Sequence, residues 1–265
     1  MSGAQRIVCL TEETTETLYL LGEEARVVGI SGYTVRPERA RREKPKISAF
    51  TSAKIESILA LEPDLVIGFS DLQADIASQL IRGGVNVLIT NQRSIEEILK
   101  TIYTVGALAG VPEKAQALVE QLQQGMDAVR AAAAGLPRKP RVYFEEWDEP
   151  LISGIRWVAE LIVLAGGEEC FPELKQHKGA RLRIIADPLE VVRRAPDIII
   201  GSWCGKKFRP EQLAARPGWG AMPAVRDAQL FEIKSCDILQ PGPAALSDGL
   251  HQIATIIRRW AEARA

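Results

Sequence analysis

The chain has 265 residues, of which 33 are basic and 34 acidic, giving a formal net charge of −1. This balance gives no electrostatic reason to expect binding to nucleic acid or to a membrane surface, and no apolar run reaches the ~18 residues that a membrane span needs. Hydrophobic residues make up 46% of the chain, which is ample for the core of one large or two small domains.

The chain enters its first predicted strand with no apolar signal region ahead of it. We therefore expect either that a leader has been removed or that the protein stays in the cytoplasm. The four cysteines are widely scattered and form no CxxC pair, so neither a zinc site nor a redox dithiol is expected. They are Cys9, Cys170, Cys204 and Cys236.

The first half of the chain alternates predicted strands and helices. Strands are expected over residues 6–10, 25–30, 47–50, 65–68 and 85–89, and helices over residues 15–21, 54–61, 73–82 and 94–109. A polar loop is expected at residues 11–14, and a solvated loop or short helix at 36–46. The apolar run at 65–68 does not alternate, which is typical of a strand buried on both faces of a parallel sheet. This order predicts a doubly wound α/β lobe.

Residues 112–134 form a long, strongly helix-prone segment. Pro112 stands at a first-turn position, and Gly135 and Pro137 follow the segment. At 1.5 Å per residue this helix would reach roughly 35 Å, which is long enough to cross between two lobes. We therefore predict an N-terminal lobe over residues 1–110, a bridging helix over 111–136 and a C-terminal lobe over 137–265.

An internal repeat supports two similar lobes. In both halves a helix runs through a Pro-Asp turn into an apolar strand that ends in glycine. Pro63 and Pro196 are separated by 196 − 63 = 133 positions, and Gly68 and Gly201 by the same 133. Two copies of one unit predict two α/β lobes around a cleft.

The second lobe is expected to open with a strand at residues 141–144 and a loop at 145–150, followed by a helix from Arg156 to Gly166. The loop gathers carboxylates around Trp147, namely those of Glu145, Glu146, Asp148 and Glu149. Paired carboxylates carry out acid–base catalysis in glycosidases. Because the surrounding pattern does not look like a hydrolase, we interpret them as polar anchors beside an aromatic wall.

The chain resembles the class III periplasmic substrate-binding proteins of ABC importers, and the vitamin B12-binding members most of all. The resemblance is carried by residues 6–8, 15–16, 28–33, 55–67, 111–112, 195–197, 216–219, 224–227, 241–243 and 248–250. It implies two doubly wound α/β lobes joined by one long α-helix, with a ligand cleft between the lobes. It also implies a monomeric, periplasmic, non-catalytic protein that captures a corrinoid, such as cobalamin, for delivery to an ABC importer.

The resemblance also implies which residues line the cleft. They are Glu12, Glu13, Tyr33, Phe50 and Phe69 in the first lobe, and Glu146, Trp147, Trp203 and Asp237 in the second. A flat, partly apolar ligand needs aromatic faces and a few polar groups, which these side chains supply. Trp157 and Trp219 are expected to pack in the core.

Other chemistry finds little support in the sequence. The two histidines, His177 and His251, cannot supply a multi-histidine metal site, so no metal ligands are predicted. There is no Gly-rich phosphate loop and no GxSxG nucleophile elbow. We therefore predict neither catalytic residues nor a catalytic cofactor.

Importer-docking members of the resembled family carry a surface glutamate on each lobe. Glu56 matches the first position, whereas the second falls on Leu189 with Glu190 beside it, so Glu56 and Glu190 are the predicted docking residues. Two alternatives stay open: binding of haem or a ferric siderophore, and a cytoplasmic corrinoid-handling enzyme or chaperone. The acidic pair Glu12 and Glu13 disfavours anionic ferric siderophores.

Overall fold

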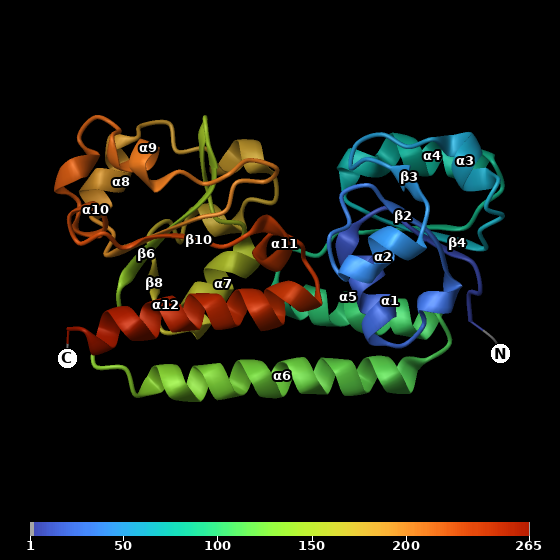
Figure 1. Cartoon of the computed structure of the whole chain (residues 1–265), viewed down its shortest axis with the longest axis horizontal. Coiled ribbons are helices and arrows are strands. Elements are labelled where there is room, and N and C mark those ends of the chain that lie inside the picture. Colours follow the sequence, from blue (N-terminus) through green and yellow to red (C-terminus); the bar gives the residue numbers. More distant parts are fainter. Residues whose placement is uncertain (1–2, 265) are drawn as a thin grey trace. The chain divides into compact units, whose positions relative to one another are not determined.

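The computed structural model describes residues 3–264, and within them the chain divides into two compact units (Figure 1). Unit 1 comprises the chain as far as Gln92, together with Glu96–Leu122 and Pro241–Pro243. Unit 2 comprises Arg93–Ile95, Gln123–Gln240 and the chain from Ala244 onward. Each unit contains a sheet with helices, so the predicted two-lobe α/β fold is confirmed.

Unit 1 is built on a five-stranded parallel sheet of order β3-β2-β1-β4-β5. Its strands are β1 (Ile7–Cys9), β2 (Val27–Ser31), β3 (Lys46–Ser48), β4 (Leu65–Phe69) and β5 (Val87–Thr90). Every residue of β1 and β4 is buried, which explains why the apolar run at 65–68 does not alternate.

Helices cover both faces of this sheet. They are α1 (Glu12–Leu20), α2 (Glu38–Glu43), α3 (Ile55–Leu59), α4 (Ala74–Arg82) and α5 (Ile95–Leu108). Successive side chains of β1 enter two separate core clusters, as expected for a strand with period 2. Cys9 packs in a cluster with Leu18 of α1, whereas Val8 packs in a cluster with Leu80 of α4. The doubly wound arrangement is therefore confirmed for unit 1.

The predicted polar loop at residues 11–14 was wrong. Helix α1 begins at Glu12, and Thr11 is the extended residue before it. Glu12 and Glu13 occupy the first turn, where the helix dipole favours acidic side chains. The polarity of this stretch therefore signalled a helix start, and the two acids are buried.

The long helix α6 spans Pro112–Ala134, the range predicted from its flanking proline and glycine residues. The division between the units falls within it, after Leu122. One continuous helix therefore contributes residues to both units.

Unit 2 has a sheet of order β10-β9-β6-β7, with β8 also paired to β6. Its strands are β6 (Arg141–Asp148), β7 (Leu151–Ser153), β8 (Glu168–Glu169), β9 (Ile198–Gly201) and β10 (Leu230–Glu232). The parallel neighbours β8-β6-β9-β10 reproduce the order β2-β1-β4-β5 of unit 1. The repeat predicted from the sequence therefore extends to strand topology.

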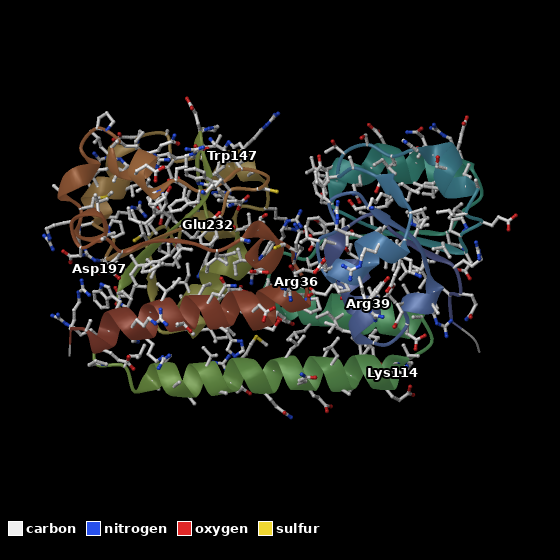
Figure 2. All side chains as sticks on the ribbon, viewed as in Figure 1. Arg36, Arg39, Lys114, Trp147, Asp197 and Glu232 are labelled. Atoms are coloured by element: carbon white, nitrogen blue, oxygen red, sulfur yellow. The ribbon has the colours of Figure 1, made fainter. Side chains whose placement is uncertain are left out.

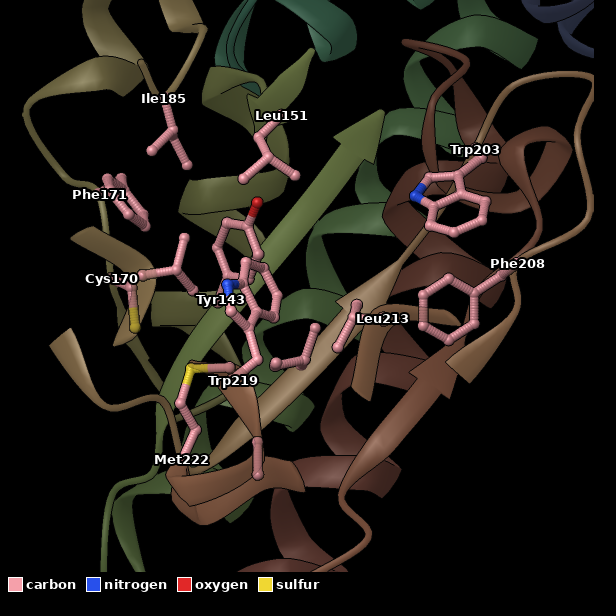
Figure 3. Packing of buried hydrophobic residues seen from close by; sticks show 13 residues of the cluster. Tyr143, Leu151, Cys170, Phe171, Ile185, Trp203, Phe208, Leu213, Trp219 and Met222 are labelled. Atoms are coloured by element: carbon pink, nitrogen blue, oxygen red, sulfur yellow. The ribbon is translucent and has the colours of Figure 1, made fainter. Parts of the chain in front are cut away.

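The helices of unit 2 are α7 (Arg156–Leu164), α8 (Leu189–Arg194), α9 (Pro210–Ala214), α10 (Pro223–Arg226), α11 (Ser235–Ile238) and α12 (Leu250–Glu262). One core cluster packs the side of the sheet that carries Tyr143 and Ile199 against α8, α9 and α10 (Figure 3). Trp219 is fully buried there and makes an edge contact with Tyr143, so its predicted core position is confirmed. Trp157 is also buried, and its indole N–H donates to the Ile238 carbonyl at 2.9 Å.

The predicted loop at residues 145–150 was wrong. Strand β6 continues to Asp148 and folds back through Glu149-Pro150 into β7, which pairs with it in antiparallel orientation. Glu145, Glu146 and Asp148 misled the prediction, because each of these carboxylates pairs with a basic side chain that is distant in the sequence.

Candidate ligand site

The predicted ligand residues of unit 1 follow the carboxyl ends of three neighbouring parallel strands. Glu12 and Glu13 come after β1, Tyr33 after β2, and Phe69 ends β4. Phe50 lies just beyond the edge strand β3. Ligands of open α/β sheets bind at this end of the strands. The fold therefore brings these residues to one edge of the unit 1 sheet.

Glu12 is buried at this edge and holds the segment after β2. Its Oε1 accepts a hydrogen bond from the Arg36 backbone N–H at 2.8 Å. Burial raises the pKa of Glu12 to about 8, and the nearby carboxylates of Glu16 and Glu13 act in the same direction. At neutral pH its carboxyl is therefore mainly protonated.

Two further acids of α1 have partners nearby. Glu16 pairs with the Arg36 guanidinium at 2.9 Å, and Glu13 accepts the Thr11 hydroxyl at 2.7 Å. Glu13 also contacts Gly242: a Cβ added at that glycine would lie 2.4 Å from the Glu13 Cβ. A glycine is required at position 242 because its backbone lies too close to Glu13 to leave room for any side chain.

The segment after β2 presents an aromatic ring to solvent. The Tyr33 side chain is 66% exposed. Arg41 donates hydrogen bonds to the carbonyl groups on both sides of it, those of Gly32 at 2.8 Å and Thr34 at 2.7 Å. Arg41 therefore fixes the backbone on both sides of Tyr33, while the Tyr33 ring itself stays exposed and can contact a ligand.

Gln73 connects three of these strand ends, and the sequence analysis missed it. Its side chain is fully buried. The carboxamide accepts from the Phe69 N–H at 2.8 Å and donates to the Phe50 carbonyl at 2.8 Å and the Leu10 carbonyl at 3.4 Å. Gln73 therefore positions the chain at Phe50 and Phe69. A polar residue at the start of an amphipathic helix gave no signal of this role.

In unit 2 the carboxylates of β6 are all engaged by basic side chains. Glu145 is fully buried and pairs with both terminal nitrogens of Arg216, at 2.6 and 2.9 Å. Glu146 makes a similar bidentate pair with Arg183, at 2.7 and 3.0 Å. Asp148 binds the Lys206 ammonium at 2.5 Å. These carboxylates anchor the strand and the loops around it.

The two tryptophans predicted to contact ligand differ in their surroundings. Trp203 is only 4% exposed, packs in the core cluster of unit 2 and donates its indole N–H to Glu145 at 3.2 Å. Trp147 is partly buried on the rim of the same cluster, near the end of β6 (Figure 2). Trp147 is therefore the more accessible of the two rings.

Asp237 lies in the short helix α11 and is partly buried. Its carboxylate accepts from the Gln252 amide of α12 at 3.1 Å. The carbonyl of the same residue packs against Gly249, where an added Cβ would lie 2.4 Å away. These contacts fix α11 against the start of α12.

The predicted docking residues also differ from one another. Glu56 is exposed on α3. Glu190, on α8, pairs with Arg193 and Arg194 at 2.8 Å each, and the hydrogen bond from Arg194 is the main reason that its pKa is lowered. Beside it Leu189 presents an apolar side chain that is 47% exposed.

Unit 1 also contains an open groove of about 570 Å³ between α4 and the edge strand β5. Its lining includes Ser70, Asp71, Ile81, Arg82 and Asn91, and none of the nine lining residues is a predicted ligand residue.

Within residues 3–264, no group of three or more His, Cys, Asp or Glu side chains is arranged to hold a metal ion. Among the helices described, none is both long and apolar enough to cross a membrane.

Comparison with known proteins identifies relatives for this architecture. A vitamin B12-binding protein of Yersinia pestis is 28% identical over 175 residues, which is 64% of this chain and 61% of that protein. The chain therefore matches less than two thirds of the length of this curated relative.

Solved structures match over nearly the whole chain. The periplasmic vitamin B12-binding protein of Vibrio cholerae is 22% identical with a TM-score of 0.77, covering 98% of this chain and 99% of that one. A periplasmic haem-binding protein of Roseiflexus sp. RS-1 is 24% identical with a TM-score of 0.80, covering 96% and 100%. These likenesses establish a shared fold. The family model described as periplasmic binding protein matches residues 7–236, and the chain accordingly belongs to the periplasmic binding protein family.

Proposed function

We propose that this protein captures a corrinoid outside the cytoplasm and delivers it to an ABC importer. The ligand contacts assigned to it are the strand-end residues of unit 1 (Glu12, Glu13, Tyr33, Phe50 and Phe69) and those of unit 2 (Glu146, Trp147, Trp203 and Asp237). The chain is a binding protein rather than an enzyme, as its family and relatives are.

The observation that carries the proposal is the combination of an exposed Tyr33 ring with buried acids at one sheet edge. A corrinoid is a large, flat ring system bordered by primary amides. Aromatic faces pack against such a ring, and carboxyl oxygens accept hydrogen bonds from amide N–H groups. The vitamin B12-binding relative agrees with this choice of ligand.

Calorimetric titration with cyanocobalamin and cobinamide tests the proposal. We expect saturable 1:1 binding with a Kd below about 10 µM, which is about −7 kcal/mol. Tyr33→Ala should weaken binding at least about fivefold, or about 1 kcal/mol, because the ring loses its stacking contact. Tyr103→Ala removes an exposed tyrosine from α5 and should leave binding unchanged. Absence of heat with both corrinoids would reject the proposal.

A second candidate, haem binding, is favoured by the same Tyr33, because a phenol oxygen can ligate haem iron. His177 and His251 lie elsewhere, after a 3₁₀ turn and in α12 respectively. Tyr33→Phe separates the two candidates. The variant keeps the ring, so corrinoid affinity should persist, whereas the absorption band of tyrosine-ligated haem should shift or disappear.

A further inference from the structure

We propose that Lys206 is a specificity-determining residue that binds an anionic oxygen group at the periphery of the ligand. The chemistry it would recognise is a phosphodiester or a carboxylate carried on a flat ring system. This inference rests on the proposed function, because it assigns a contact within the same ligand site. It is carried by the position of the Lys206 ammonium in unit 2.

The turn that carries Lys206 is held firmly after β9. The Lys206 N–H donates to the Trp203 carbonyl at 3.2 Å, and Gly205 supplies the positive φ of 73° that the turn needs. The Phe208 ring packs against Trp203 with their centroids 5.0 Å apart. It lies over Gly201, where an added Cβ would be 2.1 Å from the ring. The backbone at Lys206 is therefore fixed from both sides.

The ammonium lies among two aromatic rings and one carboxylate. Its Nζ is 5.5 Å from the Trp147 ring centroid, 5.1 Å from the Trp203 ring centroid and 2.5 Å from Asp148 Oδ2. Indole faces attract cations electrostatically. A flexible lysine is thus held at one place at the end of β6, next to the tryptophan that the proposed function assigns to ligand contact.

The ammonium keeps capacity for a ligand. Lysine has three N–H donors, and within residues 3–264 this ammonium makes one hydrogen bond, to Asp148. The indole rings of Trp147 and Trp203 attract the ammonium through their faces, and this contact uses none of its N–H donors in a conventional hydrogen bond. The Lys206 side chain is still 44% exposed, so an anion can reach it from solvent. Lys207 and Arg209, both exposed, add positive charge to the same loop.

Corrinoids allow a direct test, because cobalamin carries a phosphodiester in its nucleotide loop and cobinamide lacks that loop. We expect Lys206→Met to weaken cyanocobalamin binding at least about tenfold and to change cobinamide binding by less than about twofold. Lys206→Arg keeps the charge and should retain most of the preference. Lys207→Met, in the same loop, is the matched control and should leave both affinities unchanged.

The outcomes separate this inference from the proposed function. If Lys206→Met lowers the affinity for both corrinoids equally, Lys206 only holds its loop against β6, and the inference is overturned. Unchanged affinity for both corrinoids overturns it as well. If the wild-type protein binds neither corrinoid, the proposed function fails, and haem compared with haem dimethyl ester tests Lys206 by itself. If Lys206→Met weakens the binding of haem but not of its dimethyl ester, the role of Lys206 is supported. If the substitution affects both compounds equally, or if neither compound binds, the role of Lys206 is overturned. Thermal unfolding by circular dichroism verifies that each variant is folded.

Discussion

Glu145 and Arg216 form a bidentate ion pair inside unit 2, with Glu145 fully buried. The same carboxylate also accepts hydrogen bonds from the Tyr143 hydroxyl at 3.1 Å and the Trp203 indole at 3.2 Å. Burial raises the pKa of Glu145, and the hydrogen bonds from Arg216 oppose that shift. The Arg216 guanidinium therefore compensates the negative charge of Glu145, which would be unfavourable in the core without it.

Arg216→Met should lower the free energy of unfolding by about 3 to 5 kcal/mol, because Glu145 loses its compensating charge in the core. Urea unfolding followed by circular dichroism measures the change. Arg226→Met is the control, since Arg226 pairs with Asp227 on the surface and should cost at most about 1 kcal/mol. Equal effects of the two substitutions would contradict the assignment.

The contribution of Glu12 to the stability of the protein should fall as pH rises from about 4.5 to about 8. Burial raises the pKa of Glu12 from 4.5 to about 8, so within this range the folded protein retains a proton that the unfolded chain releases. The contribution is fully present below pH 4.5 and changes by at most about 1.4 kcal/mol per pH unit.

Urea unfolding across this pH range measures the Glu12 contribution. Glu12→Gln cannot titrate and should reduce the slope of unfolding free energy against pH, whereas Glu38→Gln, on the exposed side of α2, should leave the slope unchanged. Glu13, Glu16 and Arg36, which lie beside Glu12, are unchanged in both variants. Identical slopes in wild type and Glu12→Gln would show that Glu12 is ionised in the folded protein.

Gln73→Leu should destabilise unit 1 by about 2 to 4 kcal/mol and weaken ligand binding. The substitution leaves the Phe69 N–H and the Phe50 carbonyl without their side-chain partner. Gln79→Leu tests an exposed glutamine of α4, the helix that follows Gln73, whose amide donates to the Asp75 carbonyl at 3.3 Å. Chemical unfolding and ligand titration of both variants provide the measurement. A Gln73→Leu protein with wild-type affinity would remove Gln73 from the positioning role.

If the proposed delivery to an importer takes place, Glu56→Ala should impair it while leaving ligand affinity and thermal stability unchanged, because the Glu56 side chain is exposed. Uptake by vesicles containing the cognate transporter measures the effect, with Glu96→Ala on α5 as a control for an exposed acid of unit 1. Glu190→Ala should reduce uptake less than Glu56→Ala, since Arg193 and Arg194 already pair with the Glu190 carboxylate. The reverse order would assign docking mainly to α8.

The hydrophobic pattern predicted most of the fold because the elements that matter are locally encoded. Helix α6 has the predicted bounds, since Pro112 favours a helix start and Gly135 a helix end. The Pro-Asp turns at Pro63 and Pro196 lead into strands buried on both faces, so the repeat could be read from spacing and apolar runs.

The polar residues of the candidate site were harder to predict, because their partners lie far along the chain. Glu145, Glu146 and Asp148 suggested a loop, yet Arg216, Arg183 and Lys206 stand 71, 37 and 58 positions away from them. Each pair forms only after the sheet has assembled. Similarly, nothing near Gln73 indicates that its carboxamide joins segments 63 and 23 residues earlier in the chain.

The segment Pro241–Pro243 belongs to unit 1, although most of unit 2 precedes it in the sequence. Gly242 packs against Glu13, and the Pro241 carbonyl accepts from the Gln92 amide at 3.1 Å. A protein fragment ending at Leu122 would therefore lack part of its own lobe. Severed halves should recover a native unit 1 only when mixed, which makes the protein a candidate for split-reporter complementation rather than for independent expression of its lobes.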